Sequence, residues 1–93
     1  MGRKAGRKWD ARPHAGGVNE SDAVTLTTIR AWCATGKARR IREEARLSQQ
    51  EVADTIGAAR HSVSRWESGD RLPRTDVALR YAALLLSIEA AQR

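Results

Sequence analysis

The stretch LSQQEVADTIGAARHSVSRWESG, residues 47–69, contains two short helical patterns separated by one glycine. Ser48 precedes the first pattern and Glu51 follows three residues later, which is the spacing of a capping box at the start of a helix. Gly57 suits the left-handed conformation that often ends a helix. Ala58 and Ala59 then form a turn. The stretch therefore predicts two helices joined by a tight connection.

The second pattern has an apolar side and a basic side. At about 100° per residue, Ala59, Val63 and Trp66 fall within about 60° of one another, so we expect them to pack inward. No acidic residue interrupts the opposite side, whereas a solvated surface usually mixes both signs. That outer side carries Arg60, His61, Ser64 and Arg65.

The outer residues are of the types that read DNA bases. Arginine can donate two hydrogen bonds to O6 and N7 of guanine, and serine and histidine can bond to several base edges or to phosphate. The plainer alternative is a basic surface helix without a partner. The spacing of Ala53, Gly57 and Val63 favours the DNA-binding interpretation, because it suits two closely crossing helices.

The rest of the chain predicts an all-α protein. We expect a helix over residues 21–35, capped by Ser21 and ended by Gly36, with Leu26, Ile29, Trp32 and Cys33 on its core side. Further helices are expected over 37–46 and from Thr75 to the end of the chain. The predicted organisation is a flexible basic arm (1–20), an additional N-terminal helix (21–36) and a DNA-binding domain (37–93).

The charge of the chain indicates a polyanionic partner. Seventeen basic residues stand against 11 acidic ones, giving a net charge of +6 and a pI of about 10.7. Neutralising phosphates releases condensed counterions, so such a balance favours nucleic acid, although basic tails can also simply aid solubility. The predicted arm carries a dense group of basic residues that we expect to contact DNA: Arg3, Lys4, Arg7, Lys8 and Arg12.

Several classes of protein are disfavoured. A single cysteine, Cys33, excludes an internal disulfide and a multi-cysteine metal site. His14 and His61 lie in unrelated contexts, and the chain shows no paired carboxylates, nucleophile elbow or phosphate loop, so we expect no enzyme, metal or cofactor. No apolar run reaches the length of a membrane span. We therefore expect a cytoplasmic protein, too short for a separate domain that binds a small molecule.

Residues 38–85 resemble the helix-turn-helix domain of the lambda-repressor and Cro-like family. The resemblance rests on IREEARLSQQEVA (41–53), on Ile56-Gly57, on SVSRWESG (62–69) and on Pro73, in order and without gaps. It implies a five-helix lambda-repressor-like DNA-binding domain preceded by the basic arm. Two residues depart from the family pattern. Ala59 replaces the usual hydroxyl cap, which costs about 1 kcal/mol unless Ser62 compensates, and Trp66 is larger than the usual aliphatic residue.

The resemblance also implies roles for individual residues. Arg42 and Glu67 match an ion pair that orients the recognition helix. The remaining matches are positions that contact DNA. Base contacts are implied for Arg60, His61, Ser64 and Arg65, and backbone contacts for Ser48, Gln49, Ser62 and Ser68.

The predicted function is that of a sequence-specific regulator of transcription that binds double-stranded DNA. It would read the major groove with helix 60–68 and act as a repressor of phage or mobile-element type. An antitoxin that binds a toxin and regulates its own operon is the alternative. In the last helix Val77, Tyr81, Leu84, Leu85 and Ile88 should face the core. The apolar residues Leu79, Leu86 and Ala90 lie elsewhere, and would be covered either by a second copy in a homodimer or by helix 21–35 within a monomer.

Overall fold

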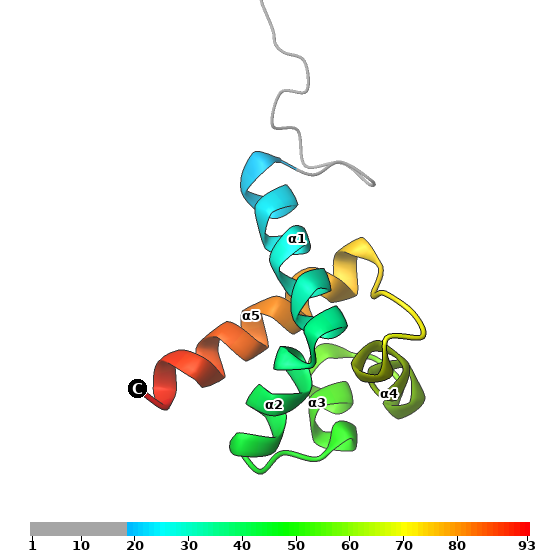
Figure 1. The fold of residues 1–93 in the computed structure, drawn as a ribbon, viewed down its shortest axis with the longest axis vertical. Coiled ribbons are helices and arrows are strands. Elements are labelled where there is room, and N and C mark those ends of the chain that lie inside the picture. The colour runs from blue at the N-terminus through cyan, green and yellow to red at the C-terminus, as the bar shows by residue number, and fades with distance from the viewer. Residues whose placement is uncertain (1–18) are drawn as a thin grey trace, which may run out of the picture.

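The computed structural model describes residues 19–93, and these form five α-helices without a strand (Figure 1). This confirms the all-α, five-helix prediction. The predicted arm residues Arg3, Lys4, Arg7, Lys8 and Arg12 lie outside the described range. The helices are α1 (Glu20–Thr35), α2 (Lys37–Glu44), α3 (Gln49–Ile56), α4 (Arg60–Ser68) and α5 (Thr75–Ala91).

Helix α1 begins earlier than predicted, and its cap is Asn19 rather than Ser21. The Asn19 backbone is extended, and its Oδ1 accepts a hydrogen bond from the amide of Asp22 at 2.8 Å. Ser21 already lies inside the helix, where its carbonyl accepts a bond from the Thr25 hydroxyl. The end at Gly36 is as predicted, because that glycine is left-handed with φ of 87°.

Helix α2 ends at Glu44, two residues before the predicted end. Arg46 adopts a left-handed conformation with φ of 63°. Its amide donates to the carbonyl of Glu43, and the amide of Leu47 donates to the carbonyl of Arg42. This pair of bonds is the Schellman motif, which usually places glycine at the left-handed position. No glycine marks this position in the chain, so the prediction placed the end of the helix too late.

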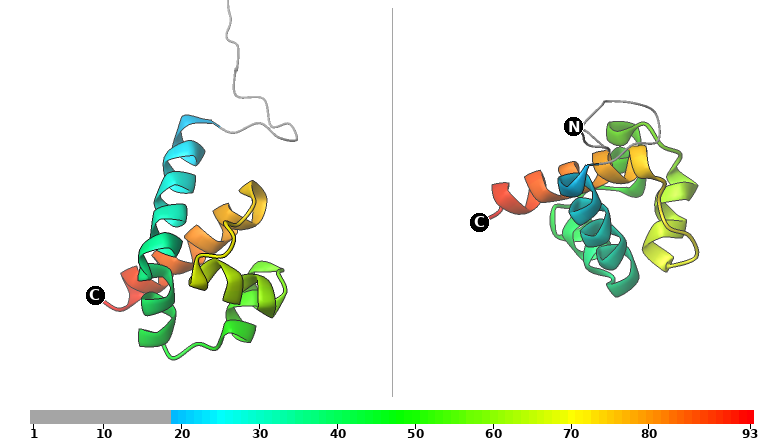
Figure 2. Two further views of the ribbon diagram at one scale, coloured as in Figure 1. Left: turned by 45° about the vertical axis from the view of Figure 1, so that its right-hand side comes forward. Right: turned by 90° about the horizontal axis from the view of Figure 1, so that it is seen from above.

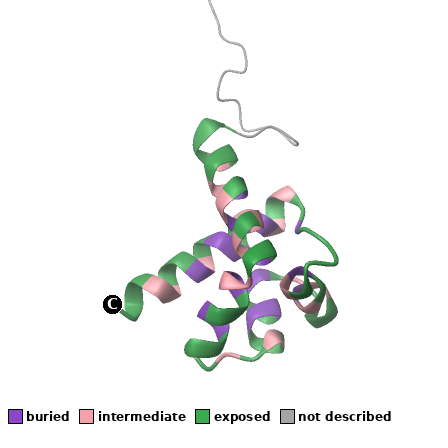
Figure 3. Ribbon diagram, in the orientation of Figure 1, coloured by how far each residue is buried: buried purple, intermediate pink, exposed green. Residues whose placement is uncertain are grey.

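The core collects side chains from all five helices (Figure 3). Helix α1 contributes Leu26, Ile29 and Cys33, as predicted, and Trp32 is half-buried against the same cluster. Helix α1 packs against α5 and also touches α2 and α4. The additional helix is therefore part of the hydrophobic core that supports α4.

Helix α5 crosses the middle of the molecule, and α1, α2 and α3 all pack on it (Figures 1 and 2). Tyr81 and Leu85 of the predicted inner stripe are buried, and Val77, Leu84 and Ile88 are half-buried against the core. Leu79, which the wheel placed outside the stripe, also packs partly against the core. Leu86 and Ala90 stay exposed on the part of α5 that points away from α4.

Candidate nucleic-acid interface

Local interactions set both ends of α3. The amide of Glu51 donates to Ser48 Oγ at 3.0 Å, and the amide of Ser48 donates to Glu51 Oε1 at 2.8 Å, which is the predicted capping box. The Ser48 backbone amide, and after it the Ser48 hydroxyl, lower the pKa of the Glu51 carboxyl by hydrogen bonding to its ionised form. Gly57 is left-handed with φ of 75° and ends α3. The turn therefore has the conformation expected from residues 48–57.

A side chain from α5 holds the end of α3. Arg80 Nε donates to the carbonyl of Ile56 at 2.8 Å. The last carbonyl groups of a helix lack partners within the helix, so a cationic donor there is favourable. This contact connects the turn before α4 to α5.

The inner side of α4 is formed by Val63 and Trp66, which are buried. The Trp66 ring lies 5.2 Å from the Tyr81 ring between centroids, tilted by 42°, so the large side chain packs onto α5. The inward placement of Ala59 was wrong, because Ala59 is exposed. It precedes the helix with an extended backbone, to which helical periodicity does not apply. Ser62 does not compensate, since no side chain caps α4 within residues 19–93.

The outer side of α4 carries the residues predicted to read bases. Arg60, His61 and Arg65 are exposed, and Ser62 and Ser64 are half-buried. The structure thus brings the basic groups onto one accessible side of a short, well-anchored helix. Their contacts with DNA stay predictions.

A bidentate ion pair joins α4 to α2. Arg42 Nε lies 2.6 Å from Glu67 Oε2, and Arg42 Nη2 donates to Glu67 Oε1 at 2.9 Å. Only 11% of the Arg42 side chain and 3% of the Glu67 side chain are exposed. Arg42 Nη1 also donates to the carbonyl of Leu47 at 2.8 Å. The pair that the resemblance implied is present, and it connects the end of α4 to the loop before α3.

Three of the predicted backbone-contacting side chains already have partners in the protein. Gln49 Nε2 donates to Glu67 Oε1 at 3.0 Å, which the sequence did not predict. Ser68 Oγ donates to the carbonyl of Arg65 at 3.0 Å. Ser48 Oγ accepts the capping bond from the amide of Glu51 at 3.0 Å. A phosphate at the start of α3 would therefore meet the backbone amide of Gln49 more readily than the Gln49 side chain.

Cys33 is unsuited to thiol chemistry. It is buried in the core, and burial, followed by the charge of Glu67, raises its pKa to about 11. The thiolate is the reactive form, so this thiol is protonated near neutral pH. The sequence-based expectation of a small buried hydrophobic side chain agrees with this environment.

Two short helices joined by a tight glycine turn, the second with a basic outer face, define a helix-turn-helix protein. A family model described as helix-turn-helix matches residues 39–86, which is more than half of the chain. The chain therefore belongs to the lambda-repressor/Cro-like helix-turn-helix family, and this membership supports a DNA-binding regulator.

Neither the search of curated proteins nor that of solved structures found a match. Helix α1 precedes the matched residues.

Over residues 19–93, no helix combines the length and apolar character needed to cross a bilayer.

Proposed function

We propose that this protein is a sequence-specific regulator of transcription that inserts α4 into the major groove of double-stranded DNA. The observation that carries the proposal is the exposed face formed by Arg60, His61 and Arg65 on a helix whose opposite side is buried. A major groove admits one α-helix, and arginine forms the commonest specific contact there, with guanine. The family membership supports the same class of partner.

The remaining parts of the interface would position the helix. The first turn of α3 presents unpaired amides to a phosphate, which fixes the register on the duplex without reading sequence. The Arg42–Glu67 pair would hold α4 at a constant angle to α2, and the bond from Gln49 to Glu67 would fix it relative to α3. The predicted arm would add phosphate contacts, so its removal should weaken binding and flatten its salt dependence.

The finer parts of the proposal concern biology. We propose a non-catalytic repressor of phage or mobile-element type that acts in the cytoplasm on its own DNA sites. A homodimer would suit two half-sites about 34 Å apart. Leu86 and Ala90, exposed on α5, are accessible for such a contact, whereas α1 covers part of the rest of that helix.

The test is in vitro selection from randomised duplexes with the purified protein at near-physiological salt. Enrichment of a palindrome would support a dimeric regulator and fix the half-site spacing. A single asymmetric motif would support base reading by a monomer. A folded protein that enriches nothing would contradict the proposal and favour the antitoxin alternative.

A further inference from the structure

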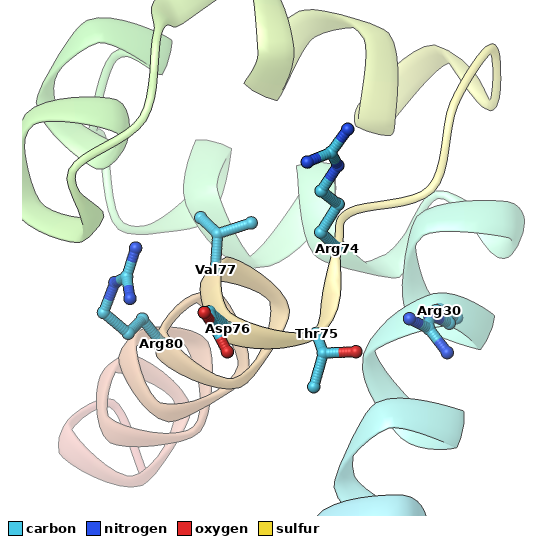
Figure 4. A pocket seen from close by; sticks show the side chains of 6 residues that line it. All are labelled: Arg30, Arg74, Thr75, Asp76, Val77 and Arg80. Carbon is cyan, nitrogen blue, oxygen red and sulfur yellow. The ribbon is translucent and has the colours of Figure 1, made fainter. Parts of the chain in front are cut away.

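A basic groove lies between α1 and the start of α5 (Figure 4). It is an open hollow of about 570 Å³. Three guanidinium groups and one carboxylate line it, so its side chains carry a net positive charge. The lining residues are Arg30, Arg74, Thr75, Asp76, Val77 and Arg80.

The arginines of the groove retain hydrogen-bond donors. Arg30 Nη2 donates to the carbonyl of Pro73 at 3.3 Å, and Arg80 Nε donates to the carbonyl of Ile56. Each guanidinium has five N–H groups, and among residues 19–93 each of these two makes only that one bond. Arg30 Nε is buried without a partner within the same range, so the donors that Arg30 can offer a ligand are its terminal N–H groups. Arg74 is exposed. Donors therefore remain for an anionic ligand at this site.

The backbone adds to the positive potential. Arg74 is the N-cap of α5 and provides no side-chain cap, so the first amides of this 17-residue helix lack side-chain acceptors from the cap position. Asp76 lies in the first turn and offsets part of this charge. No ion pair links Asp76 to Arg30, Arg74 or Arg80 among the described residues.

The groove adjoins the surface of α4. Arg74 and Val77 also line a second hollow, which includes Ser62 and Trp66 of α4 and Arg71 of the following loop. The loop after α4 and the start of α5 lie on the same side of the molecule as α4 (Figures 1 and 2). A duplex seated on α4 would thus continue toward the groove.

We propose that this groove binds the phosphodiester backbone of DNA beside the bases that α4 reads. The inference rests on the proposed function and adds a contact supplied partly by Arg30, which lies in α1 and outside the family match. The ligand class follows from charge and geometry: several guanidinium donors beside a helix N-terminus suit phosphate oxygens. The additional helix would then extend the DNA footprint as well as complete the core.

The test compares the salt dependence of binding among variants on the duplex selected by the wild-type protein. Arg74→Gln removes an exposed charge from the groove, and Arg30→Gln/Arg74→Gln removes two. Arg93→Gln is the matched control, because it removes the same charge at the far end of α5 (Figure 1). Arg30→Lys keeps the charge, and a thermal melt of each variant verifies folding.

We expect the slope of log K against log salt to fall by about 0.9 for each phosphate that the variant no longer neutralises. The slope should be smaller by about 0.9 for Arg74→Gln and by about 1.8 for Arg30→Gln/Arg74→Gln. It should not change for Arg93→Gln, and all variants should select the same bases. If both groove variants keep the wild-type slope while the wild-type protein still selects its site, the groove does not bind phosphate. The proposed function would then stand without it. A wild-type protein without sequence preference would instead overturn the proposed function, and a smaller slope for the groove variants on random duplex would still support the groove.

Discussion

Replacing Arg42 by methionine removes one half of a nearly buried ion pair while keeping an apolar chain of similar length. The Glu67 carboxylate, whose side chain is 3% exposed, would then lose two hydrogen bonds of 2.6 and 2.9 Å. Breaking a buried pair from one side costs about 3–5 kcal/mol. We expect the lower end, about 3 kcal/mol, because Gln49 still donates to Glu67 Oε1. That loss raises the unfolding equilibrium constant by more than about 100-fold.

Urea unfolding followed by tryptophan fluorescence measures this change, since linear extrapolation gives the free energy of unfolding in water. The matched control is Arg39→Met in the same helix. Arg39 pairs with Glu43 at 3.0 Å, but these side chains are 61% and 51% exposed, so the control should lose no more than about 0.5 kcal/mol. The double variant Arg42→Met/Glu67→Leu leaves no unpaired carboxylate and should be more stable than Arg42→Met alone. A cost for Arg42→Met no larger than for Arg39→Met would refute the reasoning.

Three further predictions concern the helix ends. Arg46→Gly should raise the free energy of unfolding by about 0.5–1 kcal/mol in a urea titration, because Arg46 has a φ of 63° that glycine adopts without strain; a loss of stability would count against strain at this turn. Ala59→Ser should supply the missing cap of α4 and add about 1 kcal/mol by the same titration, and an unchanged midpoint would show that the cap does not form. The lowered pKa of Glu51 means that its capping bonds stabilise the fold at neutral pH and are lost as the pH falls through that lowered pKa. Glu51→Gln should therefore lose less stability than wild type between neutral and acidic pH, and equal losses would contradict this role.

Local sequence signals predicted both ends of α3 correctly. The capping box and Gly57 act over a few residues, so their geometry follows from their spacing. Helical periodicity likewise predicted the exposed face of α4, because residues 60–68 are helical throughout.

The errors share a physical cause. Ala59 and Asn19 are caps, and their placement depends on an extended backbone that a helical wheel does not represent. Arg46 takes a left-handed conformation that usually marks glycine, so the end of α2 could not be read from residue type. Each of these positions lies where a helix begins or ends.

The groove could not be predicted from the sequence because its residues come from distant segments. Arg30 and Arg74 lie on α1 and on the loop before α5, and they line one hollow only after these segments have packed. A dense arginine pattern around residues 71–74 is visible in the sequence, but it does not indicate Arg30. The engagement of Gln49 with Glu67 likewise depends on how α3 and α4 pack together.

The most direct test of base reading by α4 is to repeat the in vitro selection with Arg65→Ala and with Arg93→Ala. Each substitution removes one positive charge, but only Arg65 lies on the outer side of α4. We predict that Arg65→Ala relaxes the preference at one position of each half-site, at a cost of about 1–3 kcal/mol in discrimination, whereas Arg93→Ala selects the wild-type motif. The same motif and preferences from both variants would contradict base reading by Arg65.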